Sequence, residues 1–379
     1  MGSPSEQLIK WRHHLHSIAE TAFDEQNTSR YVAEQLRQLG LDVTTGIGGT
    51  GVIGTLKRGT SNKAIALRAD MDGLPLQEKS GAAYAQTSGS MHACGHDGHM
   101  TMVLGAAAKL IDDASLDGTV HFLFQPAEEP GKGAQAMIDD GLFKRFPMDE
   151  IYGIHNMPGW PEGKLLTKPG ALMASEDNFV IRIVGRGGHA SRPQLVIDPI
   201  VVSAEVILGL QTIVSRSIDP AQSGVVSCTE IHTDGSRNAI PSEVIIKGDT
   251  RSFDKDVQLK LESRMRELVE GICQAHGATG TVEYTYEFEP TYNHPECTEA
   301  AVVAAQKVVG SQNVDGNCAQ FMGSEDFGVF LKHIPGCFMF LGMGEDHKPL
   351  HNSEFNFNDK VLEIGINFYV ETVKSRLAK

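Results

Sequence analysis

The sequence predicts an α/β protein with two domains, one inserted into the other. The 379-residue chain is longer than a single hydrophobic core usually extends. Both of its ends alternate helical patterns with short apolar strands, which predicts a mixed α/β domain. Between them, residues 175–289 follow the order β-α-β-β-α-β of a ferredoxin-like unit. We therefore expect a discontinuous main domain, residues 1–174 and 290–379, and an inserted domain, residues 175–289.

Helices of the main domain are predicted where apolar residues recur every three or four positions. The ranges are 5–20, 28–39, 98–111, 133–140, 298–309 and 359–377. Thr28 is the expected N-cap of the second helix, and Gly40 is its stop. The first helix contains three histidines that are tempting as metal ligands. We expect His13, His14 and His16 to be surface groups or internally satisfied polar groups instead.

Three apolar strands of the main domain are followed by carboxylate or imidazole side chains. The predicted strands are 51–57, 63–68, 119–124, 150–154 and 337–342. The second of them is followed by Asp70 and Asp72. The third is followed by Glu128 and Glu129, and the fourth by His155. Ligands collect at the carboxyl edge of open α/β sheets. We therefore expect Asp72, Glu128, Glu129 and His155 to gather there beside Cys94 and His96.

The stretch from Met91 to Met100 is the densest group of possible metal ligands. It holds Cys94 and His96 with further histidines and an aspartate. A thiolate and an imidazole together suit a borderline-soft divalent ion such as zinc. A lone Cys-x-His pair is more often a polar turn before a helix. The convergence with the strand ends favours the metal site.

The adjacent Glu128 and Glu129 allow two interpretations. They are either a turn exposed to water, or a working pair with one carboxylate on a metal and the other free to take a proton. The predicted edge again favours the working pair.

The inserted domain has its own pattern. Strands are predicted at 179–184, 224–231, 243–252 and 281–288, and helices at 193–215 and 256–276. A glycine-rich turn, residues 185–189, precedes the first of these helices. An exposed edge strand and two helices offer a surface for pairing, so a homodimer or higher homo-oligomer is expected.

Composition excludes several classes of partner. The net charge of −15 argues against nucleic acid and anionic membranes. We expect no membrane span, because no apolar run approaches the required length, and no signal peptide, because Met1–Lys10 lacks an apolar core. The six cysteines are scattered without close pairs, which favours reduced thiols in a cytoplasm over a disulfide framework.

Five motifs, taken together and in order, resemble one family. They are Cys94-Gly95-His96-Asp97-Gly98-His99, Pro126-Ala127-Glu128-Glu129, Gly187-Gly188-His189-Ala190, Gly323-Ser324-Glu325-Asp326-Phe327 and Pro349-Leu350-His351-Asn352. The chain resembles the metal-dependent amidohydrolases related to aminoacylase, in the branch of hippurate hydrolase, bacterial N-acyl-amino-acid hydrolases and auxin-conjugate hydrolases. The similarity runs from about residue 8 to the C-terminus. It implies a catalytic domain like that of zinc exopeptidases, with the inserted domain as lid and dimerisation domain.

The resemblance implies two divalent ions per chain, zinc above all, with manganese, nickel or cobalt as alternatives. The implied ligands are Cys94, His96, Glu129, His155 and His351. The thiolate of the first would bridge the ions, which share and activate a water. Asp72 would orient a ligating imidazole. Glu128 would be the general base, and His189 would stabilise the oxyanion on closure or from a neighbouring subunit.

The implied substrate is an N-acyl amino acid with a free carboxylate. Asn238 and Arg251 resemble the groups that hold this carboxylate, since arginine grips it at two points. A surface ion pair is the alternative interpretation of Arg251. Glu325 and Asp326 are not assigned to the site, because they can be acids at a helix N-terminus.

Three other functions remain open. A dipeptidase or carboxypeptidase of the same family would cleave a peptide bond, and a dipeptidase would require a free amino group on its substrate. A non-catalytic protein that holds metal is an alternative of another class. A hydrolase with Cys94 as the nucleophile is disfavoured, because a thiolate bound to a metal attacks an amide poorly.

Overall fold

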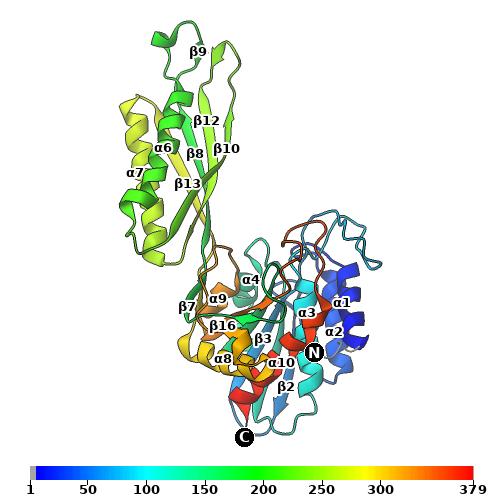
Figure 1. The fold of residues 1–379 in the computed structure, drawn as a ribbon. Coiled ribbons are helices and arrows are strands. Elements are labelled where there is room, and N and C mark those ends of the chain that lie inside the picture. The colour runs from blue at the N-terminus through cyan, green and yellow to red at the C-terminus, as the bar shows by residue number, and fades with distance from the viewer. Residues whose placement is uncertain (1–5, 379) are drawn as a thin grey trace. The chain divides into compact units, whose positions relative to one another are not determined.

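A computed structural model describes residues 6–378 of the chain. The chain divides into two compact units (Figure 1). The main unit runs to Leu172 and also contains Thr291–Ala319 and the chain from Glu325 onward. The second unit comprises Met173–Pro290 and the short segment Gln320–Ser324. Met1–Ser5, which include part of the segment tested for a signal peptide and the expected start of the first helix, lie outside the described residues.

The main unit is built on an eight-stranded mixed sheet. Its strands lie in the order β1(Asp42–Ile47), β2(Gly51–Arg58), β4(Gly118–Gln125), β3(Ala64–Asp70), β5(Glu150–Met157), β16(Gly336–Gly342), β6(Leu165–Leu166) and β15(Val314–Asp315). Strand β3 is parallel to β4 and β5, and β5 is parallel to β16. Strands β3 and β16 are buried along their whole length, as central parallel strands are. The carboxyl ends of β3, β4 and β5 therefore meet at one edge, as predicted.

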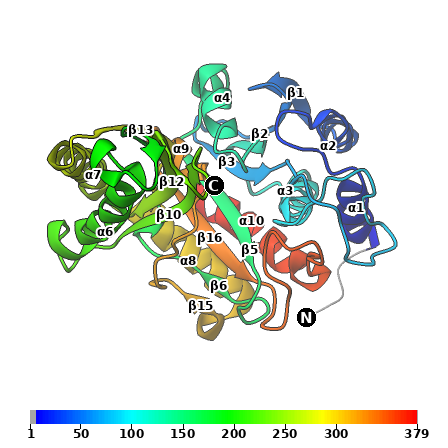
Figure 2. The same cartoon turned by 90° about the horizontal axis from the view of Figure 1, so that it is seen from above.

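Helices cover both faces of this sheet (Figure 2). They are α1(Glu6–Ser17), α2(Gln26–Gln38), α3(His96–Leu110), α4(Gly133–Asp139), α5(Leu142–Arg145), α8(Pro295–Val309), α9(Phe327–Leu331) and α10(Leu362–Leu377). Helix α3 packs against α1, α10 and β3, and most of its residues are buried. Its mixed, weakly amphipathic sequence suits such a central helix, and its first residue stands at the carboxyl edge of the sheet.

The structure corrects several local expectations in the main unit. Helix α2 begins at Gln26, so Thr28 is not its N-cap. Glu25 occupies that position, and its carboxylate accepts hydrogen bonds from Phe23 N and Ala127 N instead of capping the helix. Strand β1 was not predicted. Strand β5 extends to Met157, which places His155 inside the strand rather than after it.

The second unit contains a four-stranded antiparallel sheet and two helices. In chain order the elements are β8(Glu176–Val184), α6(Pro199–Ser217), β10(Gly224–Thr233), β12(Glu243–Ser252), α7(Lys255–Ala275) and β13(Thr279–Phe288). The strands lie in the order β10-β12-β8-β13, with every neighbouring pair antiparallel. Alternate residues of β8, namely Phe179, Ile181 and Ile183, are buried beneath the two helices.

The helix predicted over 193–215 is in fact broken. A 3₁₀ turn, η1(Pro193–Leu195), is followed by extended residues and then by α6. Asp198 caps α6 by accepting a hydrogen bond from Ile200 N, and Pro199 fills the first helical position.

Helix α6 also corrects the expectation that no segment approaches the length of a membrane span. By length and composition alone it is apolar enough to cross a membrane. Its Val202, Val206 and Leu210 are nevertheless buried in the core of the second unit. A core helix of a globular domain passes the same test, so this single helix is weak support for a span.

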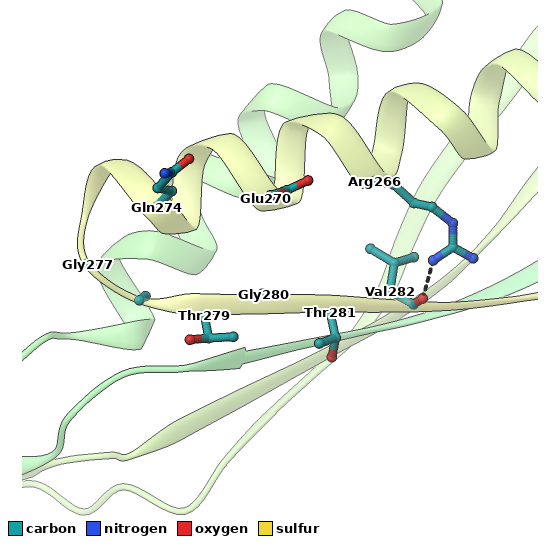
Figure 3. Close-up of a pocket in the computed structure, with 9 residues that line it drawn as sticks. Arg266, Glu270, Gln274, Gly277, Thr279, Gly280, Thr281 and Val282 are labelled. Atoms are coloured by element: carbon teal, nitrogen blue, oxygen red, sulfur yellow. Dashed lines mark hydrogen bonds between the residues drawn. The ribbon is translucent and has the colours of Figure 1, made fainter.

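The structure also contains two short pairs of strands and a recess on the surface. Strand β9(Gly188–His189) pairs with β11(Ala239–Ile240), and β7(Gly170–Met173) pairs with β14(Thr291–Asn293). The recess lies along the end of α7 and strand β13, where Arg266 donates a hydrogen bond to the carbonyl of Val282 (Figure 3). Among residues 6–378, no group of side chains suited to a metal ion lines this recess.

Candidate metal centre

Cys94 and His96 stand on either side of a turn that glycine alone accommodates. Gly95 has a φ of 94° and fills the N-cap position of α3. A Cβ at this position would lie 2.2 Å from Oδ1 of Asn156. Because both the conformation and the space require glycine, the turn holds the two flanking side chains in one arrangement.

Asp72 organises the centre through both its side chain and its backbone. Its carboxylate accepts hydrogen bonds from the backbone N–H groups of Glu128 and Glu129, each at 3.0 Å. Its backbone carbonyl lies 2.8 Å from Nδ1 of His96, which must donate that bond. The carbonyl of Asp72 is thus closer to His96 than its carboxylate, whose Oδ1 lies 3.5 Å from the same Nδ1. The carboxylate binds the backbone of the two glutamates.

The turn before these glutamates is strained and anchored. Ala127 has a φ of 48°, a conformation that residues with a side chain rarely adopt. Its N–H donates to the buried carboxylate of Glu25 at 2.9 Å. Glu25 and Asp72 therefore hold the turn from both sides, and Glu128 follows it as a buried side chain.

The five predicted ligands converge in two groups that share Cys94. The first group is Cys94, His96 and His155, and the second is Cys94, Glu129 and His351. Within each group the potential ligand atoms lie within 4.8 Å of one another. The Sγ of Cys94 is 3.4 Å from Nε2 of His155, and Nε2 of His351 is 3.5 Å from Oε2 of Glu129. The shared thiol is the arrangement expected of a bridging ligand.

The residues fit divalent cations by a second criterion. Within residues 6–378, the buried Nε2 of His96 and Oε1 of Glu129 have no hydrogen-bond partner. Buried polar atoms without a hydrogen-bond partner are uncommon in proteins and need an explanation. His155 donates from Nδ1 to the carbonyl of Asn156 at 2.8 Å, which leaves its Nε2 with a lone pair for a metal. The donor set of one thiol, three imidazoles and one carboxylate suits zinc and similar ions.

Electrostatics of the centre favour protonated ligands when no cation neutralises them. Burial raises the pKa of the Glu128 carboxyl well above its usual range, and nearby carboxylates add to the effect. Burial likewise raises the pKa of Glu129 to about 7 and that of the Cys94 thiol well above its usual value. Burial alone would lower the pKa of His96, but carboxylates led by Asp70 raise it to about 10. Divalent ions would therefore displace protons on binding.

Sequence reasoning missed a layer of buried polar groups beside the centre. Asp70 accepts from Nδ1 of His99 at 2.6 Å, and Nε2 of His99 lies 2.6 Å from Oδ1 of Asn156. Asp70 also accepts from the fully buried Arg68 at 2.8 Å. The carboxylates of Glu325, in the fourth motif, and of its neighbour bind the same guanidinium. The one available signal was charge, because Arg68 interrupts an otherwise apolar strand.

The remaining predicted residues belong to the second unit. His189 is exposed, and its Nδ1 lies 3.1 Å from the backbone N–H of Ser191. Asn238 accepts a hydrogen bond from Ala190 N through its backbone carbonyl. The structure thus brings together the five ligands, Asp72 and Glu128 in the main unit.

Arg251 is already engaged within the second unit. Its guanidinium lies 2.7 Å from Glu176 and 2.8 Å from Asp249, and it donates to Ser324 Oγ at 2.9 Å. The surface ion pair considered from the sequence is therefore present.

Comparison with known proteins gives consistent matches along nearly the whole chain. The model of peptidase family M20/M25/M40 matches residues 66–375. Hippurate hydrolase of Campylobacter jejuni is 40% identical, over 96% of this chain and 95% of that protein. N-acetyl-L-cysteine deacetylase of Bacillus subtilis is 37% identical, over 98% and 88% respectively. The crystal structure of a dinuclear metal-binding peptidase of family M20 from B. subtilis has a TM-score of 0.85 and 31% identity, over 97% and 96%.

Proposed function

This chain belongs to peptidase family M20/M25/M40 and is a metal-dependent hydrolase of amide bonds, and from that premise we propose that it cleaves N-acyl amino acids at a centre of two divalent ions. The observation that carries the proposal is the pair of ligand groups that share Cys94 and lie beside Glu128. We propose Cys94, His96, Glu129, His155 and His351 as the ligands. Zinc is the proposed metal, because thiolate and imidazole ligands suit it, and manganese, nickel or cobalt are the alternatives.

Glu128 is proposed as the general base. When bound, two divalent ions polarise the amide carbonyl and acidify the attacking water. Glu128 takes the proton of this water and later delivers it to the nitrogen of the leaving amine. Its backbone is held by Asp72, and its Oε2 lies 3.8 Å from Nε2 of His96, at the side of the ligand groups. This placement supports the assignment.

The second unit is proposed to act as a ferredoxin-like lid that supplies His189 to the oxyanion. The hydrogen bond from Ser191 N makes Nδ1 of His189 an acceptor, so its Nε2 carries the proton. An Nε2–H group is the donor that a developing oxyanion requires. We expect His189→Ala to lower kcat about 100-fold or more with little change in metal content, and a normal kcat would remove the residue from this role.

Asn238 and Arg251 are proposed to hold the substrate carboxylate. Arg251 must exchange a bond to Glu176 or Asp249 for one to the substrate, so its grip is weaker than that of a free guanidinium. Arg251→Lys should raise KM, because lysine offers no two-point contact. A KM unchanged by this substitution would leave Arg251 as an internal ion pair.

We further propose a homodimer, or a higher homo-oligomer, located in the cytoplasm. The exposed apolar residues Val201 and Leu208 on α6, with β10 at the edge of its sheet, form a surface suited to a second copy. The six cysteines are all free, which fits a reducing compartment. Sedimentation of the wild type and of Leu208→Glu tests the surface, and a monomeric wild type would refute it.

A substrate panel tests the reaction class. Benzoyl-, acetyl- and long-acyl-amino acids are compared with dipeptides, in the presence and absence of a chelator. We expect turnover of an acyl-amino acid that the chelator abolishes. Preference for dipeptides would favour the dipeptidase alternative, and binding without turnover would favour the non-catalytic one. Glu128→Gln should keep its metals and lose about two to four orders of magnitude in kcat.

A further inference from the structure

Three buried carboxylates meet beside the metal centre, and the proposed mechanism uses one of them. Oxygen atoms of Asp70, Glu128 and Glu325 lie within 4.8 Å of one another, and all three side chains are buried. Glu128 is the proposed base, so the inference below rests on the proposed function. The other two carboxylates are not among the proposed ligands.

The two oxygens of Glu325 differ in their surroundings. Oε1 accepts from Nη2 of Arg68 at 2.7 Å and from the N–H of Phe327 at 3.1 Å. Oε2 is buried, in a side chain that is 1% exposed, and has no hydrogen-bond partner anywhere between residues 6 and 378. One oxygen is therefore fixed by two hydrogen bonds, and the other is buried without a hydrogen-bond partner.

Arg68 is the cation that this cluster shares. Its side chain is 1% exposed, and it donates to Gln125 through Nε at 2.8 Å and to Asp70 through Nη1 at 2.8 Å. Nη2 is shared between Glu325 and Asp326, at 2.7 and 3.1 Å. The guanidinium thus has a partner at each nitrogen, and Glu128 is not one of them.

A buried guanidinium that loses a partner favours another carboxylate that can replace it, because an unpaired charge inside a protein is costly. Without Glu325, Nη2 of Arg68 would lose its shortest bond. Glu128 stands in the same cluster. A Glu128 carboxylate bonded to Arg68 would be turned away from the water.

We propose that Glu325 is a positioning residue: by occupying Nη2 of Arg68, it keeps the carboxylate of Glu128 off that guanidinium and available to the attacking water. Asp326 binds the same nitrogen, but its carboxylate also accepts hydrogen bonds from two other groups. Gln125 Nε2 and Ala134 N both donate to it, at 2.7 and 2.9 Å. It therefore anchors α4 and the cluster.

Kinetics of three metal-loaded variants test the proposal. Glu325→Ala should lower kcat about 10- to 100-fold, the scale of a misplaced catalytic group, with KM and metal content within about twofold of wild type. Glu325→Gln retains an oxygen that accepts from Arg68 and should keep kcat within about fivefold of wild type. Asp326→Asn is the matched control, and it should lose stability while kcat stays within about fivefold.

A structural readout is independent of any substrate. In a crystal structure of Glu325→Ala, we expect Glu128 within hydrogen-bond distance of Arg68. The proposal is overturned if Glu128 keeps its wild-type place there, or if Glu325→Gln loses as much kcat as Glu325→Ala. If the alanine variant does not fold, the glutamine variant and the control decide by the same kinetic criteria. A wild type that turns over no substrate would refute the proposed function, whereas the crystal structure would still decide the role of Glu325.

Discussion

The substitution Asp72→Asn tests how the main unit places Glu128 and Glu129. The carboxylate of Asp72 is fully buried and accepts one backbone N–H from each of Glu128 and Glu129. Asparagine has the same shape, but it offers one oxygen and one NH₂ group. Whichever way the amide is turned, one backbone N–H faces another donor.

The expected magnitude follows from these two bonds. A hydrogen bond to a charged group contributes about 1.5–3 kcal/mol, and a buried donor left without an acceptor costs about 1–3 kcal/mol. We therefore expect Asp72→Asn to lower the free energy of unfolding by about 3 kcal/mol. Displacement of Glu128 by about 1 Å lowers kcat about 100-fold. The backbone carbonyl of Asp72 remains, so the orientation of His96 should be preserved.

Urea unfolding and steady-state kinetics at saturating metal measure the two effects separately. Asp149→Asn is the control, because its exposed carboxylate accepts a single backbone N–H, from Ala64 at 2.9 Å. This control should change stability by no more than about 0.5 kcal/mol and leave kcat unchanged. If Asp72→Asn behaved like the control, the carboxylate would not be what fixes the two glutamates.

Three further predictions concern protons and packing. Burial alone would lower the pKa of His16, but its two carboxylate partners raise it to about 9. Its contribution to the free energy of unfolding, about 3 kcal/mol, should be complete below pH 6.5 and disappear as the pH rises through 9. Equal destabilisation by His16→Gln at pH 6 and pH 9.5 in thermal unfolding would contradict this. Metal affinity should rise with pH, because binding displaces protons from Cys94 and His96. Calorimetry in buffers of different ionisation enthalpy should detect the released protons. A metal affinity that does not change with pH would contradict this prediction. Gly95→Ala should lose metal and stability, because its Cβ would meet an asparagine amide at 2.2 Å. In the control Gly89→Ala, φ is similar at 93° and the space is open, so the free energy of unfolding should fall by only about 1 kcal/mol and the metal should be kept.

The sequence alone was enough to predict that most of the candidate ligands lie together. Apolar strands that end in Asp72, Glu128 and Glu129 are a local pattern, and parallel strands bring their carboxyl ends to one edge whatever the rest of the chain does. The likeness of the motifs to a known family added His351, which no periodicity connects to that edge. The family assignment itself is confirmed by the comparisons.

Tertiary structure decided which atoms perform each task. The sequence did not show that the backbone carbonyl of Asp72 accepts a hydrogen bond from His96. It also did not show that Arg68 joins Asp70 to Glu325, which is 257 positions away from the arginine. Such contacts depend on how whole elements pack, and one buried charge can choose among several distant partners. Local periodicity does not predict which partner the charge binds. The partner is determined when the core forms, because a charge that loses its water must be paired inside the protein.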